Sequence, residues 1–166
     1  ISGTQAEVTA ALVTASTKVV VSDATVTISD ADEASITATA LSAIGGATTG
    51  TVTVTNAIAI SGTVAEVTAA LVTSSTKVVV SDATVTVSDA HTLSELIAIN
   101  NATTGQITLN DYSVALVGSA ADVSAALAGS FAADYTGTVT ISDADSASIS
   151  ATTLSAIGGA TTGTVT

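Results

Sequence analysis

The chain repeats itself, and this feature constrains its fold more than any other. Residues 1–31 align without a gap with residues 60–90, and the two stretches differ at three positions. Residues 25–53 align in the same way with residues 138–166, again with three differences. Such self-similarity is typical of repeat proteins, in which each unit packs on its neighbours. We therefore expect residues 1–166 to form one segment of a repeat array.

A shorter unit lies inside these repeats. Each unit has two runs rich in Val, Ile and Thr, bounded by Asp, Asn, Ser or Gly, and then an Ala-rich run with Leu or Ile at helical spacing. In the first unit these runs are Lys18–Val21, Thr25–Ile28 and a helix over Asp32–Ile44. The pattern predicts an α/β solenoid of stacked β-β-α coils, with parallel sheets along its axis. The coils cover residues 18–50, 51–76, 77–105, 106–130 and 131–163.

Capping residues recur at the predicted helix ends. Ser and Asp accept hydrogen bonds from the first N–H groups of a helix, and they precede the predicted helices as the pairs Ser29 and Asp30, Ser88 and Asp89, and Ser142 and Asp143. Glycine is favoured just after a helix, where Gly45, Gly46, Gly158 and Gly159 stand.

Aliphatic side chains should fill thin layers between coils, because only 2% of the residues are aromatic. The expected inward strand residues are Val19, Val21, Val26, Ile28, Val52, Val54, Val78, Val80, Val85, Val87, Ile107, Leu109, Val139 and Ile141. The expected inward helix residues are Leu12, Leu41, Leu71, Leu96, Leu127 and Leu154.

Composition excludes several classes of function. The net charge is −12 and the only basic residues are Lys18 and Lys77, so we expect no nucleic-acid binding, because nothing would neutralise the phosphates. Mean hydropathy is +0.67, yet polar residues interrupt every apolar run, so no membrane insertion is expected. The chain has no cysteine, and therefore neither a disulfide framework nor a thiolate metal site.

A set of turn residues offers one candidate metal site. Asp23, Asn56, Asp82, Asp111 and Thr136 occupy equivalent positions between the two strands of each predicted coil. If the coils stack, these residues form a column, and calcium would relieve the repulsion between the carboxylates of Asp23, Asp82 and Asp111. The alternative is turn formation, since Asp and Asn bond their own backbone in turns. Calcium is the only cofactor that the sequence suggests.

Threonines offer a second candidate surface. A flat array of Thr-x-Thr strands resembles the ice-binding face of some antifreeze proteins, because alternation puts both threonines on one side of a strand. The expected column is interrupted, because alanines break it in every second coil. It consists of residues 25–27, 57–59, 84–86, 113–115 and 138–140.

No catalytic constellation emerges, and we expect no enzyme. His91 is the only histidine and replaces Asp32 of the sister repeat, which indicates a helix start. A polysaccharide-cleaving solenoid would need acids and bases that break the repeat, and the irregular stretch 91–137 offers only Asp111, Asp122 and Asp134. The carboxylates of Glu7, Glu66 and Glu95 are interpreted as solvated, and the rings of Tyr112 and Tyr135 as packing between coils, with ligand stacking as an alternative.

Three stretches, Ile60–Leu71, Ala102–Gly105 and Ile141–Ser148, resemble repeats of very large Ala/Thr/Val-rich extracellular proteins of cyanobacteria and other aquatic bacteria. The resemblance implies secretion and a structural role at the cell surface, in a surface layer, an adhesin or a filament. It brings no catalytic residues. The runner-up function is a calcium-dependent adhesin-type binding module.

Self-association is the partner that the sequence favours. Residues 1–4 open within a predicted coil, and Thr164–Thr166 stop within a predicted strand. No polar cap closes either end of the repeat pattern, although natural repeat arrays carry such caps. We therefore expect either a longer covalent array, of which this chain is an internal fragment, or end-to-end association of copies.

Overall fold

Short strands and helices alternate along the chain. The computed structural model describes residues 1–80 and 82–166. The strands are β1 (Ser2–Gly3), β2 (Val26–Ile28), β3 (Ser35–Thr37), β4 (Val52–Val54), β5 (Ala59–Gly62), β6 (Val78–Val79), β7 (Thr84–Val87), β8 (Ile107–Thr108), β9 (Leu116–Gly118) and β10 (Val139–Ile141). The helices are α1 (Gln5–Leu12), α2 (Ala38–Gly45), α3 (Val64–Leu71), α4 (Leu93–Ala102), α5 (Ala120–Leu127) and α6 (Ala151–Gly159).

Every pair of neighbouring strands is parallel, as expected for an α/β protein. One sheet has the order β1-β2-β4-β6, a second has the order β3-β5-β7-β8, and β9 pairs with β10 in a third. The register is regular: Val26 pairs with Val52, and Val52 pairs with Val78. In the second sheet Ile36 pairs with Ile60, and Ile60 with Val85.

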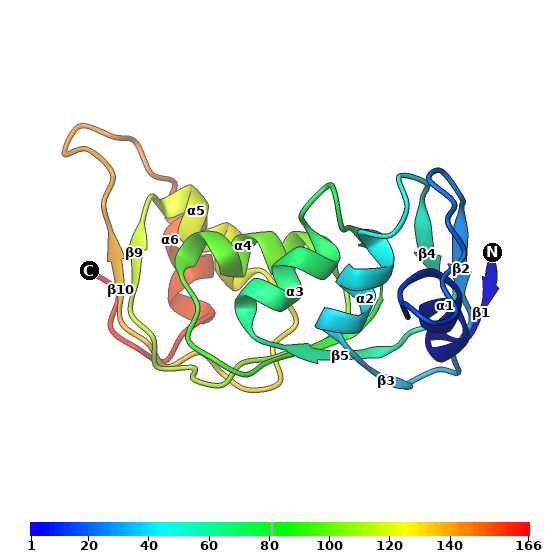
Figure 1. The fold of residues 1–166 in the computed structure, drawn as a ribbon. Helices are drawn as coiled ribbons and strands as arrows, with labels where there is room; N and C mark the ends of the chain where they lie inside the picture. Colours follow the sequence, from blue (N-terminus) through cyan, green and yellow to red (C-terminus); the bar gives the residue numbers. More distant parts are fainter. Residues whose placement is uncertain (81) are drawn as a thin grey trace.

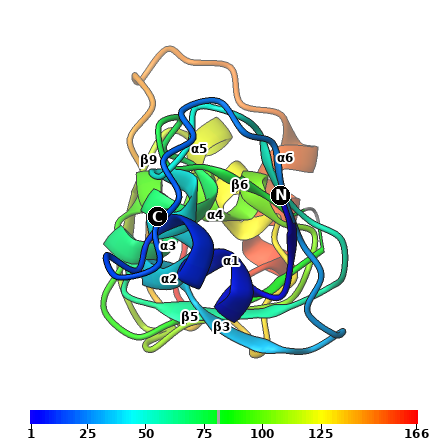
Figure 2. The ribbon, with the colours of Figure 1, turned by 45° about the vertical axis from the view of Figure 1, so that its right-hand side comes forward.

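The helices form a row along the molecule, and each helix contacts the next one in the chain. Figure 1 shows α2, α3, α4 and α5 following one another, with β3 and β5 along one side and the two termini at opposite ends. Figure 2, turned toward the N-terminal end, places α1 in front of the other helices. Within the described residues, no helix is long and apolar enough to cross a membrane.

The strands bury alternate residues, which produces one continuous core. Val26 and Ile28 of β2 are buried while Thr27 between them is half-exposed. In the second sheet the buried row contains Ile36, Ile60, Val85 and Ile107, one from each strand. Alternation with a period of two therefore explains why a chain with so few aromatics can still exclude water.

The predicted helix over Asp32–Ile44 is wrong at its start. Residues 35–37 form strand β3, whose Ser35 pairs with Ala59 of β5, and the helix begins at Ala38. Pairing with β5 gives these residues main-chain partners along one side of the strand, and this pairing overrides their local helical pattern.

The predicted strand Lys18–Val21 is also wrong, although its sequence recurs at Lys77–Val80. The second copy forms β6 at Val78–Val79, because it pairs with β4. Among residues 1–80 and 82–166, no strand adjoins the first copy, and the side chain of Val20 is 86% exposed. The same residues therefore form a strand only where another strand adjoins them.

The predicted core is confirmed at most positions. Of the predicted residues, Val26, Ile28, Val52, Val54, Val78, Val80, Val85, Val87, Ile107, Leu109, Val139, Leu12, Leu41, Leu71, Leu96 and Leu127 are buried. Val21 and Ile141 are half-buried and pack against this core. The predictions for Val19 and Leu154 are wrong, since their side chains are 57% and 42% exposed.

Leu41 and Leu154 provide a test of this core. They occupy the same position of the repeat, but Leu41 is fully buried and Leu154 is largely exposed. We expect Leu41→Ala to lower the free energy of unfolding by about 2–5 kcal/mol, and Leu154→Ala by less than about 1 kcal/mol. Denaturant unfolding at low protein concentration measures both values, and equal losses would contradict the assignment.

Candidate functional site

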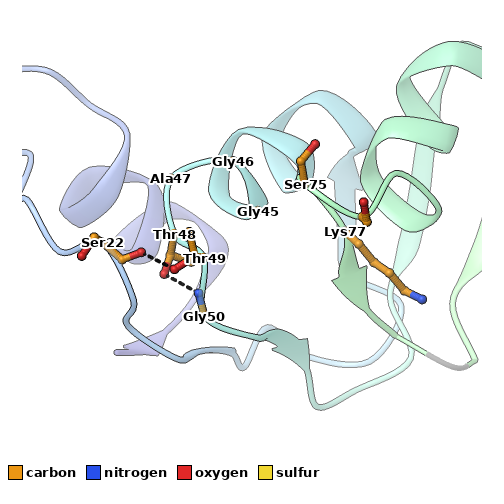
Figure 3. A pocket seen from close by; sticks show the side chains of 10 residues that line it. Ser22, Gly45, Gly46, Ala47, Thr48, Thr49, Gly50, Ser75 and Lys77 are labelled. Atoms are coloured by element: carbon orange, nitrogen blue, oxygen red, sulfur yellow. Dashed lines mark hydrogen bonds between the residues drawn. The ribbon is translucent and has the colours of Figure 1, made fainter.

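One hollow lies where the end of α2 meets the loop before Lys77. It is an open cavity of about 340 Å³, lined by Ser22, Gly45, Gly46, Ala47, Thr48, Thr49, Gly50, Ser74, Ser75 and Lys77. Figure 3 shows Thr48, Thr49 and Gly50 facing Ser22, with the Lys77 side chain pointing away from them. The cavity thus combines hydroxyls, glycine backbone and one cation at its edge.

The threonine hydroxyls of this cavity already have backbone partners. Thr48 Oγ1 donates to the carbonyl oxygen of Ala24 at 2.7 Å and accepts from Gly50 N at 3.0 Å. Thr49 Oγ1 donates to the carbonyl oxygen of Ser22 at 2.7 Å. A hydroxyl held in this way is neither a free nucleophile nor a ligand donor. The arrangement ties one segment of the chain to its neighbour.

The same contact recurs at every Thr-Thr-Gly turn. The buried Thr103 donates to Ala83 O at 2.5 Å, and it accepts from Gly105 N at 3.0 Å. The buried Thr161 donates to Gly137 O at 3.1 Å and accepts from Gly163 N at 3.0 Å. Threonine provides both the donor and the acceptor that this turn needs, so the motif has a structural explanation.

The glycine of each turn is required by close backbone contact. A Cβ atom at Gly50, Gly105 or Gly163 would lie 2.3, 2.2 or 2.1 Å from the carbonyl oxygen of Ala24, Ala83 or Gly137. Such distances are far below van der Waals contact, so no larger residue fits without backbone movement. The glycines of the Thr-Thr-Gly turns therefore set how closely neighbouring segments approach.

Three aspartates cap helices of a neighbouring segment. Asp30 Oδ2 accepts from Gln5 N at the start of α1, at 2.6 Å. Asp89 Oδ1 accepts from Val64 N of α3 at 2.7 Å, and Asp143 Oδ2 accepts from Ala120 N of α5 at 2.6 Å. A carboxylate at a helix N-terminus is stabilised by the free N–H groups and by the helix dipole.

These aspartates were predicted to cap the helices that follow them, and that assignment is wrong. The N-cap residues are Thr4, Thr37, Thr63, Thr92, Ser119 and Ser150. The spacing Thr-x-x-Glu at Thr4, Thr63 and Thr92 is the capping-box pattern and could have located these helix starts.

Glu7, Glu66 and Glu95 therefore have a structural role. A backbone N–H of Thr63, and then the hydroxyls of Thr39 and Thr63, donate to Glu66 and lower its pKa. Thr4 lowers the pKa of Glu7 through its backbone N–H and its hydroxyl, and Thr92 lowers the pKa of Glu95 through its hydroxyl and then its backbone N–H. Each carboxylate is held in its charged form by the helix start that it closes.

The repeat is interrupted by a buried polar pair, His91 and Tyr135. Their side chains are 4% and 1% exposed, and His91 Nε2 lies 3.0 Å from Tyr135 Oη. The Tyr135 hydroxyl donates to the carbonyl oxygen of Val114 at 2.7 Å, so His91 Nε2 must be the donor to Tyr135. His91 Nδ1 is then a bare acceptor, buried and without a hydrogen-bond partner.

Burial governs the ionisation of both side chains. Desolvation lowers the pKa of His91, against a weaker opposing effect of the Asp111 and Glu95 charges. Desolvation, with Asp111, raises the pKa of Tyr135 to about 12. Tyr135 also packs on Phe131, with ring centroids 6.5 Å apart. Both groups are neutral near pH 7, which suits a packing role that ties distant segments together.

The predicted calcium residues are placed differently from the predicted column. Asn56 Nδ2 donates to the backbone oxygen of Asp30 at 2.6 Å. The backbone oxygens of Asp23 and Asp82 lie beside Gly50 and Gly105. Asp111 closes a local turn by accepting from Ser113 N at 2.8 Å. Within the part of the chain that the structure describes, no three His, Cys, Asp or Glu side chains are grouped to hold a metal ion. Calcium binding stays a prediction.

The other residues singled out from the sequence lie apart. Tyr112 Oη accepts from Leu109 N at 3.1 Å, and the ring packs against the core. At the start of α5, Ser119 Oγ donates to Asp122 Oδ2 and accepts from Asp122 N. Asp134 is exposed beside a small hollow near Gly159. Each of these side chains therefore has a local setting of its own.

Acidification tests the His91–Tyr135 pair. The folded-state pKa of His91 is lowered, so the unfolded chain binds its proton first as the pH falls through about 6.5. We expect the melting temperature to fall between about pH 7 and pH 5, and His91→Gln, which keeps a donor to Tyr135, to reduce this slope. Scanning calorimetry measures both profiles, and an unchanged slope in the variant would contradict this role.

Comparisons with known proteins add no assignment. No protein-family model, curated protein or solved structure matches the chain. The function of the chain therefore has to be inferred from its own residues and contacts.

Proposed function

We propose that the chain is a structural repeat protein, an α/β solenoid of stacked β-β-α coils that forms a rod within an extracellular filament, surface layer or adhesin stalk. The observation that supports this most is the recurrence of one set of contacts between neighbouring segments. The threonines Thr48, Thr103 and Thr161 and the glycines that follow them each engage the backbone of an adjoining segment.

The distribution of polar groups supports a scaffold over an enzyme. Enzyme sites bring titratable and nucleophilic groups together in a cleft. In the described part of this chain, the hydroxyls of Thr48 and Thr49 at the cavity beside α2 bond to backbone carbonyls, and the buried polar pair that interrupts the repeat does not line that cavity. The polar residues thereby stabilise contacts between segments.

Exposure at the cell surface is part of this proposal, because the sequence resemblance implies secretion and the composition is compatible with it. The chain has no cysteine, and it carries 14 acidic against 2 basic residues, which keeps an exposed rod soluble by mutual repulsion. Ile60–Leu71, Ala102–Gly105 and Ile141–Ser148 resemble the Ala/Thr/Val-rich repeats of large extracellular bacterial proteins. We therefore assign the chain to that class of structural proteins.

Solution scattering tests the rod. We expect the chain to be elongated, and a covalent tandem of two copies to be roughly twice as long with an unchanged cross-section, because coils add along one axis. Small-angle X-ray scattering measures both the longest dimension and the cross-section. A tandem that thickens as it lengthens would contradict a continuous solenoid.

A second candidate function rests on the register of the second sheet. Thr37, Ser61, Thr86 and Thr108 pair in one row across four strands, all on the face opposite the buried row. Neighbouring strands in a sheet are about 4.8 Å apart, so the row places four hydroxyl-bearing residues at regular spacing, of which Thr37 also caps α2. This row differs from the interrupted column predicted from the sequence, and it suits the ordering of water at an ice surface.

The hydroxyl row is tested by ice recrystallisation. If it binds ice, the chain inhibits crystal growth, and Thr86→Lys abolishes the inhibition because a charged chain disrupts the flat line of hydroxyls. Thr140→Lys, on the exposed face of β10, is the matched control and should leave the inhibition intact. Wild-type chain without any inhibition would rule this function out.

A further inference from the structure

The chain contains a well-packed internal joint between two neighbouring segments. At this joint α2 packs on α3, β3 pairs with β5, and β4 pairs with β6. One side of the joint is carried by residues 35–54 and the other by residues 59–79. Leu41 and Ile60, one from each side, are at most 1% exposed.

Both halves of this joint recur at the two ends of the chain. Residues 148–166 repeat the sequence of residues 35–53, apart from Ser150 for Thr37 and Thr153 for Ala40. Residues 1–20 repeat residues 60–79, apart from Gln5 for Val64 and Ala15 for Ser74. The chain thus carries a second copy of each surface, and the two lie at opposite ends of the molecule (Figure 1).

Residues that are buried at the internal joint are exposed in these second copies. Leu154, equivalent to the buried Leu41, is 42% exposed. Ile1 and Val19, equivalent to the buried Ile60 and Val78, are 45% and 57% exposed. Four of the six large hydrophobic side chains exposed in the described structure therefore belong to these two surfaces. Three of the four have a buried equivalent, and the fourth, Val20, is equivalent to the exposed Val79.

The glycine at the end of α2 and its equivalent in α6 have different surroundings. A Cβ atom on Gly45 would lie 1.9 Å from the carbonyl oxygen of Thr76, so the joint requires glycine there. The equivalent residue, Gly158, has nothing within 4 Å of a Cβ position. Glycine inside a helix costs about 1 kcal/mol relative to alanine. Gly158 thus weakens α6 without any contact in this chain that requires it.

We propose that the C-terminal surface of one chain docks on the N-terminal surface of a second copy, in the register of the internal joint. In this contact α6 packs on α1 of the second copy, and Val165 and Thr166 pair with its Val19 and Val20, as Val52 and Thr53 pair with Val78 and Val79. The proposal rests on the repeat architecture proposed above, and it specifies the partner and the contact.

A polar contact of the internal joint also has equivalent residues on the two end surfaces. Thr39 Oγ1 donates to Glu66 Oε1 at 2.8 Å across the joint, and the equivalent residues are Thr152 and Glu7. Gln5 replaces the buried Val64, and its Nε2 donates to Thr9 Oγ1 within α1. Because the surfaces are unlike and lie at opposite ends, the contact does not close into a dimer but continues head to tail.

Two adjacent glycines give the sharpest test. Gly158→Ala should strengthen α6 and raise the melting temperature of the monomer, yet weaken association by about tenfold to a hundredfold through the clash with Thr17 of the second copy. Gly159→Ala is the matched control, because a Cβ atom at the equivalent Gly46 lies 3.4 Å or more from its neighbours.

Sedimentation velocity over a range of protein concentrations measures the association. Wild type and Gly159→Ala are expected to form dimers and longer species at high concentration, with salt favouring them because both copies are acidic. A wild-type chain that stays monomeric, or a Gly158→Ala variant that associates as wild type does, would overturn the proposal.

Cysteine pairs test the contact between copies separately from the strand register within one chain. The chain has no native cysteine, and Thr53→Cys with Val79→Cys should form a disulfide within one chain. Mixing the single variants Val20→Cys and Thr166→Cys should give a crosslinked heterodimer, well above a mixture of Val117→Cys and Thr166→Cys. Failure of the internal disulfide overturns the repeat register itself. An internal disulfide without the heterodimer overturns only the docking of copies.

Discussion

The close approach of neighbouring main chains is the constraint on which the rest of this structure depends. Parallel strands leave each segment with N–H and C=O groups that only an adjoining segment can satisfy. Gly50, Gly105 and Gly163 allow that approach, because any side chain would strike a neighbouring carbonyl. The threonine two residues before each glycine then bonds both its own turn and the neighbouring carbonyl. Small side chains throughout the chain are a consequence of this spacing.

Much of the fold could be predicted from the sequence, since the relevant signals are local. The parallel α/β class follows from alternation of Val and Thr with Ala-rich helical runs, and the buried Val26 and Val52 follow from the period of two. The strand prediction that is wrong concerns residues whose structure depends on a neighbouring strand. Lys18–Val21 and Lys77–Val80 are identical in sequence, yet only the second adjoins a strand and becomes one. No local pattern distinguishes them.

The candidate site was less predictable than the fold, for the same reason. Asp30 looks like the cap of the helix that follows it, and it caps α1, 25 residues earlier in the chain. His91 stands directly before the N-cap Thr92 of α4, as its predicted helix-start position requires, but the sequence does not show that it is buried against Tyr135 with an unpartnered Nδ1. Contacts between residues so far apart in sequence depend on the register of the sheets, which composition and spacing do not specify. The Thr-x-x-Glu pattern of the capping boxes was available locally and would have corrected the helix starts.

The aspartate caps also bear on how such a chain can change length during evolution. Asp30, Asp89 and Asp143 serve α1, α3 and α5, which are every second helix. A helix and the aspartate that completes it therefore belong to one heritable module of two units, close to the 59-residue spacing that separates residues 1–31 from 60–90. Duplication or loss of a whole module leaves every cap in place, whereas recombination within a module separates a helix from its carboxylate. Unequal crossing-over should therefore be tolerated in steps of two units, so that gene length in such arrays varies by modules rather than by single units.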